Sequence, residues 1–433
     1  MPLHLPPDHA ERMVLAEEVH ARPPEPLETP SRVTYAAVAI AEEDRERELE
    51  HLGSLCEGFG VEPPTADSTQ IAAALGPVRL KWERHGEFSS YTFSAPGTSA
   101  EPFGDPAAAK LPPGWLSHVP GRTMVAAHAE LVPAPAGPPD AEFLSARFGD
   151  NLVVGAEVGA GNGLAFTDFK VHDDGYSRFL LMHRRFTPHQ AGRTMQRLFE
   201  IEAYRMMALL ALPIARAQLP RIVAVERSLA ALTAEMARGD RDDEELLHEL
   251  TRLAAEIESE LAASQFRYGA CRAYAELVDR RIAELRERRL SGIQTIEEFM
   301  ARRLTPAVAT CITASQRLHD LSERVDRARG LLSARVDVAR ERQNQALLES
   351  MDRRAKLQSR LQETVEIISV AAVVYYVTGL VGYVARGLDS QEAGIDPDLV
   401  VALSIPFVVV AVILVLRRAR RRILASHGDD AAG

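Results

Sequence analysis

The chain has 433 residues, 46% of them hydrophobic, and a formal net charge of −11 at pH 7. This length and composition allow two or three structural units with real cores. The acidic balance argues against nucleic acid as a partner, because phosphate backbones are bound by basic surfaces. The three cysteines, Cys56, Cys271 and Cys311, have no spacing typical of a metal or redox motif, so we expect free thiols in cores.

The first 185 residues predict a mixed α/β domain. The N-terminal stretch MPLHLPPDHAERM has no apolar core and no cleavage site, so no signal peptide is expected. Helical spacing of apolar residues predicts helices at 8–19 and 42–56, and the segment 95–120, dense in proline and glycine, predicts a long loop. Seven predicted strands favour an α/β sandwich: 33–40, 78–84, 88–94, 123–132, 152–157, 164–171 and 176–183.

After Pro188 the pattern becomes helical throughout. We expect helices at 190–212, ended or kinked at Pro213, then at 220–238 and 242–289, and a longest one at 305–360. An uninterrupted helix from Pro306 to the end of the first apolar run would be roughly 120 Å long at 1.5 Å per residue, so its apolar seam would need partner helices or neighbouring subunits. That seam steps by threes and fours, as in a coiled coil, at Leu318, Leu321, Val325, Ala328, Leu332, Val336 and Ala339.

Two uncharged apolar runs, 367–385 and 399–416, are each long enough for a membrane-spanning helix. The linker between them is acidic, whereas basic residues stand on the outer side of both runs. By the positive-inside rule we expect both chain ends in the cytoplasm. Arginine greatly outnumbers lysine and alanine is abundant, which indicates a GC-rich bacterial genome, so the expected location is the bacterial inner membrane. The basic residues are Arg353, Arg354, Lys356 and Arg360 before the first run and Arg417, Arg418, Arg420, Arg421 and Arg422 after the second.

These patterns predict an α+β protein with an N-terminal mixed α/β sandwich domain, a long helical coiled-coil stalk and a C-terminal two-helix transmembrane hairpin. We expect a cytoplasmic α/β domain, a helical region, a long stalk helix, a first transmembrane helix, an exported loop, a second transmembrane helix and a basic cytoplasmic tail. Their boundaries are 1–185, 186–304, 305–364, 365–385, 386–398, 399–416 and 417–433 respectively.

Two polar clusters are candidate sites. Near the N-terminus His20 and Arg22 follow two glutamates at a helix end, where helix-dipole complementarity and a functional contact are both open interpretations. A second cluster stands at the start of a predicted helix, where carboxylates stabilise the N-terminus; the alternative is a weak docking point for Mg²⁺ or Ca²⁺. Its residues are Asp240, Asp242, Asp243 and Glu244. No other cofactor is expected.

Polar and small residues along the stalk and first span form a third candidate group. Asn344 lies in a polar break of the seam, which either sets the helix register or lines a hydrated axis. The others share roughly one face of the helix, where small and hydroxyl side chains suit close helix contacts or a pore lining. The pore-lining candidates are Asn344, Thr364, Tyr375, Thr378, Gly379 and Gly382.

The segment Glu17-Glu18-Val19-His20-Ala21-Arg22-Pro23, with the hairpin containing Tyr375-Tyr376, is similar to an uncharacterised bacterial family of predicted membrane-anchored proteins. That likeness covers nearly the whole chain and implies no known activity. The order of parts also resembles the CorA-type divalent-cation transporters, and this second resemblance implies a pentameric channel. The Gly-Met-Asn signature that ends the first span in that family is replaced here by Gly379-Leu380-Val381-Gly382-Tyr383-Val384, so its Mg²⁺ site does not carry over.

Two functions from different classes follow. One is a divergent CorA-like oligomeric cation channel or transporter; the other is a membrane-anchored scaffold or sensor that binds a cytoplasmic partner of unknown identity. Because no nucleophile–base pair, metal spacing or cofactor loop stands out, we do not expect an enzyme. Membrane lipid and further copies of the chain are the expected partners, with association through the stalk and first span. The helices at 190–289 are a competing cover for the seam.

Overall fold

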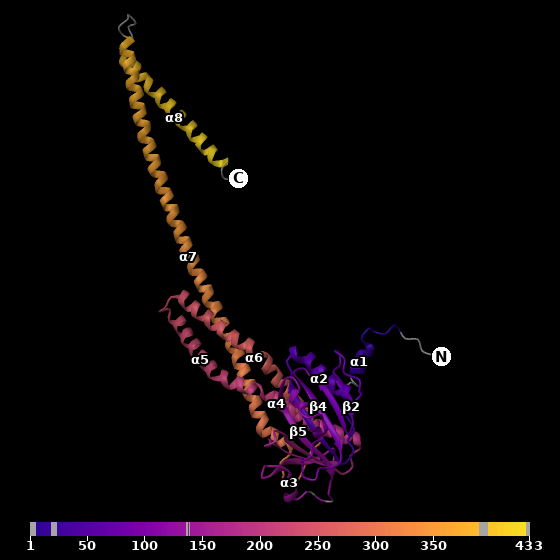
Figure 1. Cartoon of the computed structure of the whole chain (residues 1–433). Helices are drawn as coiled ribbons and strands as arrows, with labels where there is room; N and C mark the ends of the chain where they lie inside the picture. Colours follow the sequence, from indigo (N-terminus) through magenta and orange to yellow (C-terminus); the bar gives the residue numbers. More distant parts are fainter. Residues whose placement is uncertain (1–5, 19–23, 136, 138, 389–396, 430–433) are drawn as a thin grey trace. The chain divides into compact units, whose positions relative to one another are not determined.

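The computed structural model describes residues 6–18, 24–135, 137, 139–388 and 397–429. The chain divides into two compact units, Met1–Gly330 and Leu331–Gly433. The first unit contains a sheet, of which β2, β4 and β5 are labelled in Figure 1. Nine described strands form this one mixed sheet, in the order β2-β3-β4-β1-β5-β8-β7-β6-β9. Only β5 and β8 are parallel neighbours. The strands are β1 (Ser31–Ala39), β2 (Gln70–Leu75), β3 (Val78–Arg84), β4 (Phe88–Pro96), β5 (Arg122–Pro133), β6 (Val154–Val158), β7 (Gly163–Val171), β8 (Ser177–His183) and β9 (Arg288–Arg289).

Helices cover both faces of this sheet because its strands alternate their apolar side chains. In β1, Tyr35 packs in a core shared with α4, whereas Ala36 packs in a core shared with α2. A third cluster on the second face joins Leu180 of β8 to Phe148 of α3. The described helices are α1 (Arg12–Glu18), α2 (Arg45–Gly58), α3 (Ala141–Phe148), α4 (Pro188–Leu209), α5 (Ala211–Arg238), α6 (Asp243–Leu285), α7 (Ile296–Leu388) and α8 (Pro397–Asp429).

The mixed α/β class is confirmed, and each of the seven expected strands is present with small shifts at its ends. The layers are helix, single sheet and helix. Strand β2 went unpredicted because it is rich in alanine, which has a weak preference for strands. Helix α3, capped by Asp140, and the two-residue strand β9 are too short to give a periodic signal.

The predicted helix boundaries at Pro213 and Pro220 are wrong. The helix is interrupted at Leu210, between α4 and α5. Pro213 therefore lies in the first turn of α5, where a backbone N–H needs no partner within the helix. Pro220 lies in the interior of the same helix. The sequence pattern alone does not distinguish these tolerated prolines from helix-ending ones.

Helix α7 begins at Ile296 rather than at 305, because its first turn is capped by side chains. The Glu287 carboxylate accepts hydrogen bonds from the backbone N–H groups of Ile296 and Glu297, both at 3.0 Å. The Thr295 hydroxyl accepts the Glu298 N–H at 3.1 Å, and the Glu298 carboxylate accepts the Thr295 N–H at 3.2 Å. This reciprocal capping box fixes the helix start.

The first part of the expected stalk seam is buried within the chain itself. Leu318, Leu321 and Val325 are at most 2% exposed. Leu318 and Leu321 line a narrow groove with Ile222 and Val225 of α5 and with Ile257 of α6. Helices α5 and α6 therefore cover this part of the seam, which is the competing explanation given above.

In the second unit, Leu332 and Val336 of α7 are buried, whereas most apolar side chains further along α7 and on α8 are exposed. A Cβ added to Gly382 would lie 3.3 Å from Val401 Cγ2, so the two helices meet closely there. Within the part of the chain that the structure describes, three stretches are long and apolar enough to cross a membrane: Pro188–Arg238, Ile296–Gly387 and Asp398–Val415. A third of the apolar window of Pro188–Arg238 (33%) is buried in the protein, against none (0%) in the other two.

Candidate functional site

A polar cleft lies between the β3–β4 hairpin and helix α4. It arises from the alternation Val78-Arg79-Leu80-Lys81-Trp82-Glu83, which sends apolar side chains to one face of β3 and charged ones to the other. The apolar set packs in the core shared with α2. On the other face the register of β3 with β4 sets charged residues opposite hydroxyls: Arg79 opposite Ser94, Lys81 opposite Thr92 and Glu83 opposite Ser90.

Helix α4 and a segment before β1 that contains Glu25 and Leu27 complete the walls of the cleft. The segment crosses α4 at Gly192, where a Cβ would lie 1.8 Å from the Glu25 carbonyl oxygen, so only glycine fits there. Its backbone is held by a hydrogen bond from the Leu27 N–H to the Pro188 carbonyl at 3.0 Å. Polar and apolar side chains together line the rest: Tyr35, His85, Phe88, Met195, Gln196, Phe199, Glu200 and Tyr204.

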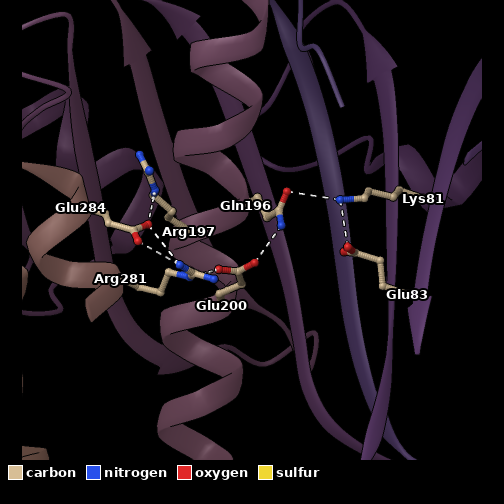
Figure 2. Close-up of polar contacts among 7 residues, drawn as sticks. All are labelled: Lys81, Glu83, Gln196, Arg197, Glu200, Arg281 and Glu284. Atoms are coloured by element: carbon tan, nitrogen blue, oxygen red, sulfur yellow. Dashed lines mark hydrogen bonds and ion pairs between the residues drawn. The ribbon is translucent and has the colours of Figure 1, made fainter. Parts of the chain in front are cut away.

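A continuous chain of polar contacts runs from the cleft into helix α6 (Figure 2). Lys81 Nζ donates to Gln196 Oε1 at 3.3 Å and forms an ion pair with Glu83 Oε1 at 3.0 Å. Gln196 Nε2 donates to Glu200 Oε1 at 2.7 Å, and the second carboxylate oxygen of Glu200 accepts from Arg281 of α6. The β3 lysine is thereby linked to α6 through two side chains of α4.

The chain continues along α6 to a second arginine of α4. Arg281 Nη1 donates to Glu284 Oε1 at 3.0 Å, and Arg197 Nε donates to Glu284 Oε2 at 2.9 Å (Figure 2). Burial opposes the charge on Arg281, but the carboxylates of Glu200 and Glu284 outweigh it and raise the pKa of the guanidinium. Arg281 therefore stays charged and joins α4 to α6.

The ion pair at the cleft is deeply buried. The side chains of Lys81 and Glu83 are 7% and 8% exposed. Burying two charges is favourable only when they are paired and hydrogen-bonded, and Lys81 meets both conditions through Glu83 and Gln196. Nearby, burial and the neighbouring Tyr204 and Glu200 raise the pKa of Tyr35 well above its usual value, so its hydroxyl stays protonated.

A second ion pair ties α6 to the turn of the β3–β4 hairpin. Arg267 Nη2 donates to both carboxylate oxygens of Glu87, at 2.5 and 2.7 Å. Tyr274, seven residues further on, stacks on Tyr204 of α4 with 5.8 Å between ring centres. Arg267, Tyr274 and Arg281 thus follow one face of α6, at heptad spacing, along the side where the cleft lies.

The acidic cluster proposed as a metal site lies at the start of α6. Asp242 occupies the N-cap position without a side-chain capping hydrogen bond, and Asp243 and Glu244 lie in the first turn of the helix. Asp240 pairs with Arg238 at 3.4 Å. Over residues 6–18, 24–135, 137, 139–388 and 397–429, no three His, Cys, Asp or Glu side chains are arranged to hold a metal ion.

The pore-lining candidates fall into two groups. One group lines a groove between α7 and α8 within the second unit: Tyr375, Thr378, Gly379 and Gly382. Asn344 and Thr364 lie earlier on α7 and do not line it. The Thr378 hydroxyl donates to the Val374 carbonyl of its own helix at 2.6 Å, so its hydrogen is already used.

The polar cluster of His20 and Arg22 lies outside the described residues, as does 389–396 of the predicted exported loop.

The buried thiols of Cys271 and Cys311, far apart in sequence, meet between α6 and α7, and the hydrogen bond from Cys311 lowers the pKa of Cys271.

The cleft between β3–β4 and α4 was not predicted from the sequence. The alternation in β3 signals one charged face, but nothing local indicates that α4 and α6 supply the rest.

A family model described as "Protein of unknown function (DUF3422)" matches residues 7–423. The chain belongs to this family. The match confirms the expected membership of an uncharacterised family over nearly the whole chain. No curated protein and no solved structure matches the chain. The resemblance to CorA-type transporters and the role of the Glu-Val-His-Ala-Arg-Pro segment stay predictions.

Replacing Arg281 with methionine tests the polar chain between α4 and α6. We expect R281M to lower the free energy of unfolding by roughly 1–3 kcal/mol, because Glu200 and Glu284 lose their shared donor. The neighbouring exposed residue provides the matched variant R280M, which should change stability little. Denaturant unfolding followed by the fluorescence of Trp82 and Trp115 measures both; equal losses in the two variants would contradict the structural role of Arg281.

Proposed function

We propose that this protein is a membrane-anchored sensor whose α/β unit binds a small ligand in the cleft between β3–β4 and α4. The observation that carries the proposal is the unbroken polar chain from Lys81 in the cleft to Arg281 on α6 (Figure 2). A ligand that accepts a hydrogen bond from Lys81 acts on the same ammonium that donates to Gln196, and Gln196 in turn positions Glu200. Occupancy of the cleft is thereby coupled to the contact between α4 and α6.

The membrane anchor is the pair of apolar stretches near the C-terminus. Of the three candidate spans, Pro188–Arg238 forms α4 and α5 of the first unit and is partly buried there, which accounts for its hydrophobicity. The apolar windows of the other two contain no buried residue, and Tyr376 and Leu380 of α7 and Phe407 of α8 are at least 65% exposed. A bilayer is the cover that this exposed hydrocarbon requires. The proposal is a two-span hairpin in the inner membrane.

Binding rather than catalysis is the role that the cleft's chemistry supports. Its ammonium is held by Glu83, its inner carboxylate Glu200 by Arg281, and its rim carboxylate Glu25 by Arg79 at 2.7 Å. Paired charges of this kind are poor nucleophiles and poor general bases. The protein is therefore proposed to be no enzyme.

Self-association is proposed through a later part of α7 than the sequence pattern indicated. Since α5 and α6 cover Leu318 and Leu321, the exposed apolar residues further along α7 are the available surface. They recur at intervals of three, four and ten residues on one side of the helix, as in a coiled coil with a polar interruption. These residues are Leu347 (57% exposed), Met351 (66%), Leu361 (68%), Val365 (61%) and Ile368 (70%).

A cation channel is the second candidate function. The groove lined by Tyr375, Thr378, Gly379 and Gly382 favours it, because small and hydroxyl side chains on one helix face suit a pore lining in a ring of subunits. Against it stands the absence of Met and Asn from 379–384. The sensor is therefore the preferred proposal.

Topology is tested with reporter fusions. We expect alkaline phosphatase fused after the C-terminus to be inactive and the same enzyme inserted between Gly387 and Leu388 to be active, because only the acidic linker faces outward. A green fluorescent protein at the same two positions should give the reverse pattern. An active phosphatase at the C-terminus would overturn the two-span arrangement.

Permeability separates the sensor from the channel. We expect liposomes containing the purified protein to remain impermeable to Mg²⁺, Co²⁺, Zn²⁺ and Na⁺, since the hairpin only anchors the protein. Ion-sensitive dyes inside the vesicles measure the flux, and empty vesicles are the control. A flux that depends on the protein and falls in G379V or G382V would establish the channel and displace the sensor.

Oligomeric state tests the proposed surface on α7. We expect the detergent-purified protein to associate at micromolar concentration and L361D to weaken that association at least tenfold, because each buried leucine contributes about 1.5–3 kcal/mol. S359D introduces the same charge about 200° around the helix and should leave the mass unchanged. Light scattering measures the mass; a monomeric parent protein would remove both the oligomer and the channel.

A further inference from the structure

We propose that the cleft between β3–β4 and α4 binds a neutral polyhydroxylated small molecule, of the sugar or cyclitol class. This inference rests on the ligand-binding role proposed above and names the class of ligand. It is carried by two features of the lining: its charges are already compensated, and its unused hydrogen-bonding groups belong to hydroxyls and to one ammonium.

Charge compensation argues against an ionic ligand. Three carboxylates at the cleft, Glu25, Glu83 and Glu200, each face a cation, namely Arg79, Lys81 and Arg281. An anion that approached Lys81 would also meet Glu83, 3.0 Å from the same ammonium. A cation that approached Glu200 would meet Arg281 in the same way. Either ligand would leave a buried charge without its partner, which costs more than the new contact contributes.

Hydroxyl groups from β4 supply the free hydrogen-bonding capacity. Ser90, Thr92 and Ser94 alternate along the strand and face the cleft. Over the described residues, the side-chain hydroxyls of Thr92 and Ser94 form no hydrogen bond within the protein, whereas Ser90 contacts His85 Nε2 at 3.3 Å. Each free hydroxyl both donates and accepts, as do the hydroxyls of a polyol.

Lys81 adds a directed donor to this row. Its ammonium carries three N–H groups, of which Glu83 and Gln196 take two within the described structure. The third can donate to a ligand oxygen without breaking the ion pair. Because Lys81 stands opposite Thr92 in the register, a ligand hydroxyl at this point receives from the ammonium and exchanges a hydrogen bond with the threonine.

Apolar surface completes the fit. Leu27, Phe88, Met195 and Phe199 line the same cleft as the polar groups. Binding sites for small molecules combine such apolar walls with a few placed polar groups. The C–H faces of a sugar or cyclitol ring match the apolar wall, while the hydroxyls on the ring edge match β4.

The test uses the full-length protein in a detergent without a sugar head group. D-glucose, myo-inositol and glycerol are the neutral probes, and inorganic phosphate, acetate and glycine are the charged ones; ligand-observed NMR detects weak binding and calorimetry gives the dissociation constant. We expect at least one cyclic neutral probe to bind, with affinity reduced roughly tenfold in T92V and in S94A, since each variant removes one hydrogen bond.

The matched control is T123V, which removes an exposed hydroxyl from β5 and should not change the affinity. Equal losses of affinity in T92V and T123V would overturn the assignment. Thermal unfolding of both variants shows whether either loss comes from misfolding. If T92V misfolds, the affinity of S94A decides the test. Phosphate, acetate or glycine binding that depends on Thr92 would overturn the neutral class while the sensor stands. Binding by none of the six probes would overturn the ligand class, while the reporter fusions judge the membrane anchor independently.

Discussion

The fit of α4 onto a sheet whose two halves differ in polarity is the constraint on which the rest of the first unit depends. Over β1, β5 and β8 the helix buries apolar side chains such as Leu198 and Phe199, with Tyr35 stacked on Phe199 at 4.6 Å. Over β3 and β4 the same helix faces Lys81 and Glu83. It must therefore carry Gln196 and Glu200 on that side, because a buried ion pair without further hydrogen bonds would destabilise the fold.

Satisfying the polar half of the sheet determines how α6 and α7 attach. Glu200 needs a cation, and Arg281 of α6 provides it. Helix α6 ends at Leu285 with Arg286 in left-handed backbone (φ 52°), and Glu287 follows with its carboxylate on the first turn of α7. Burial raises the pKa of Glu287, and the two N–H groups it accepts from oppose that rise. Glu287, which lies just beyond the helix that holds Arg281, thus positions the start of α7.

Much of the sheet could be predicted because its strands carry alternating or β-branched residues, as in β1 and β7. Strand β2 could not, since Ala72 to Ala74 carry no such preference. The cleft was beyond local patterns for a different reason. Lys81, Gln196 and Arg281 come from three elements that only the tertiary fold brings together, and the i, i+4 pair of Gln196 and Glu200 looks like an ordinary exposed helix face.

The long helix α7 shows the limit of periodicity most directly. Its three-and-four spacing indicates that one face needs a cover, but the spacing is the same whether that cover is a neighbouring helix, a second chain or a bilayer. At Leu318 and Leu321 the cover is the chain's own α5 and α6, so no second chain is needed there. At Leu347 and Leu361 the same spacing recurs on an exposed surface. The same spacing is therefore found on a buried and on an exposed part of α7. Which of the two occurs depends on whether another helix of the chain packs beside that stretch.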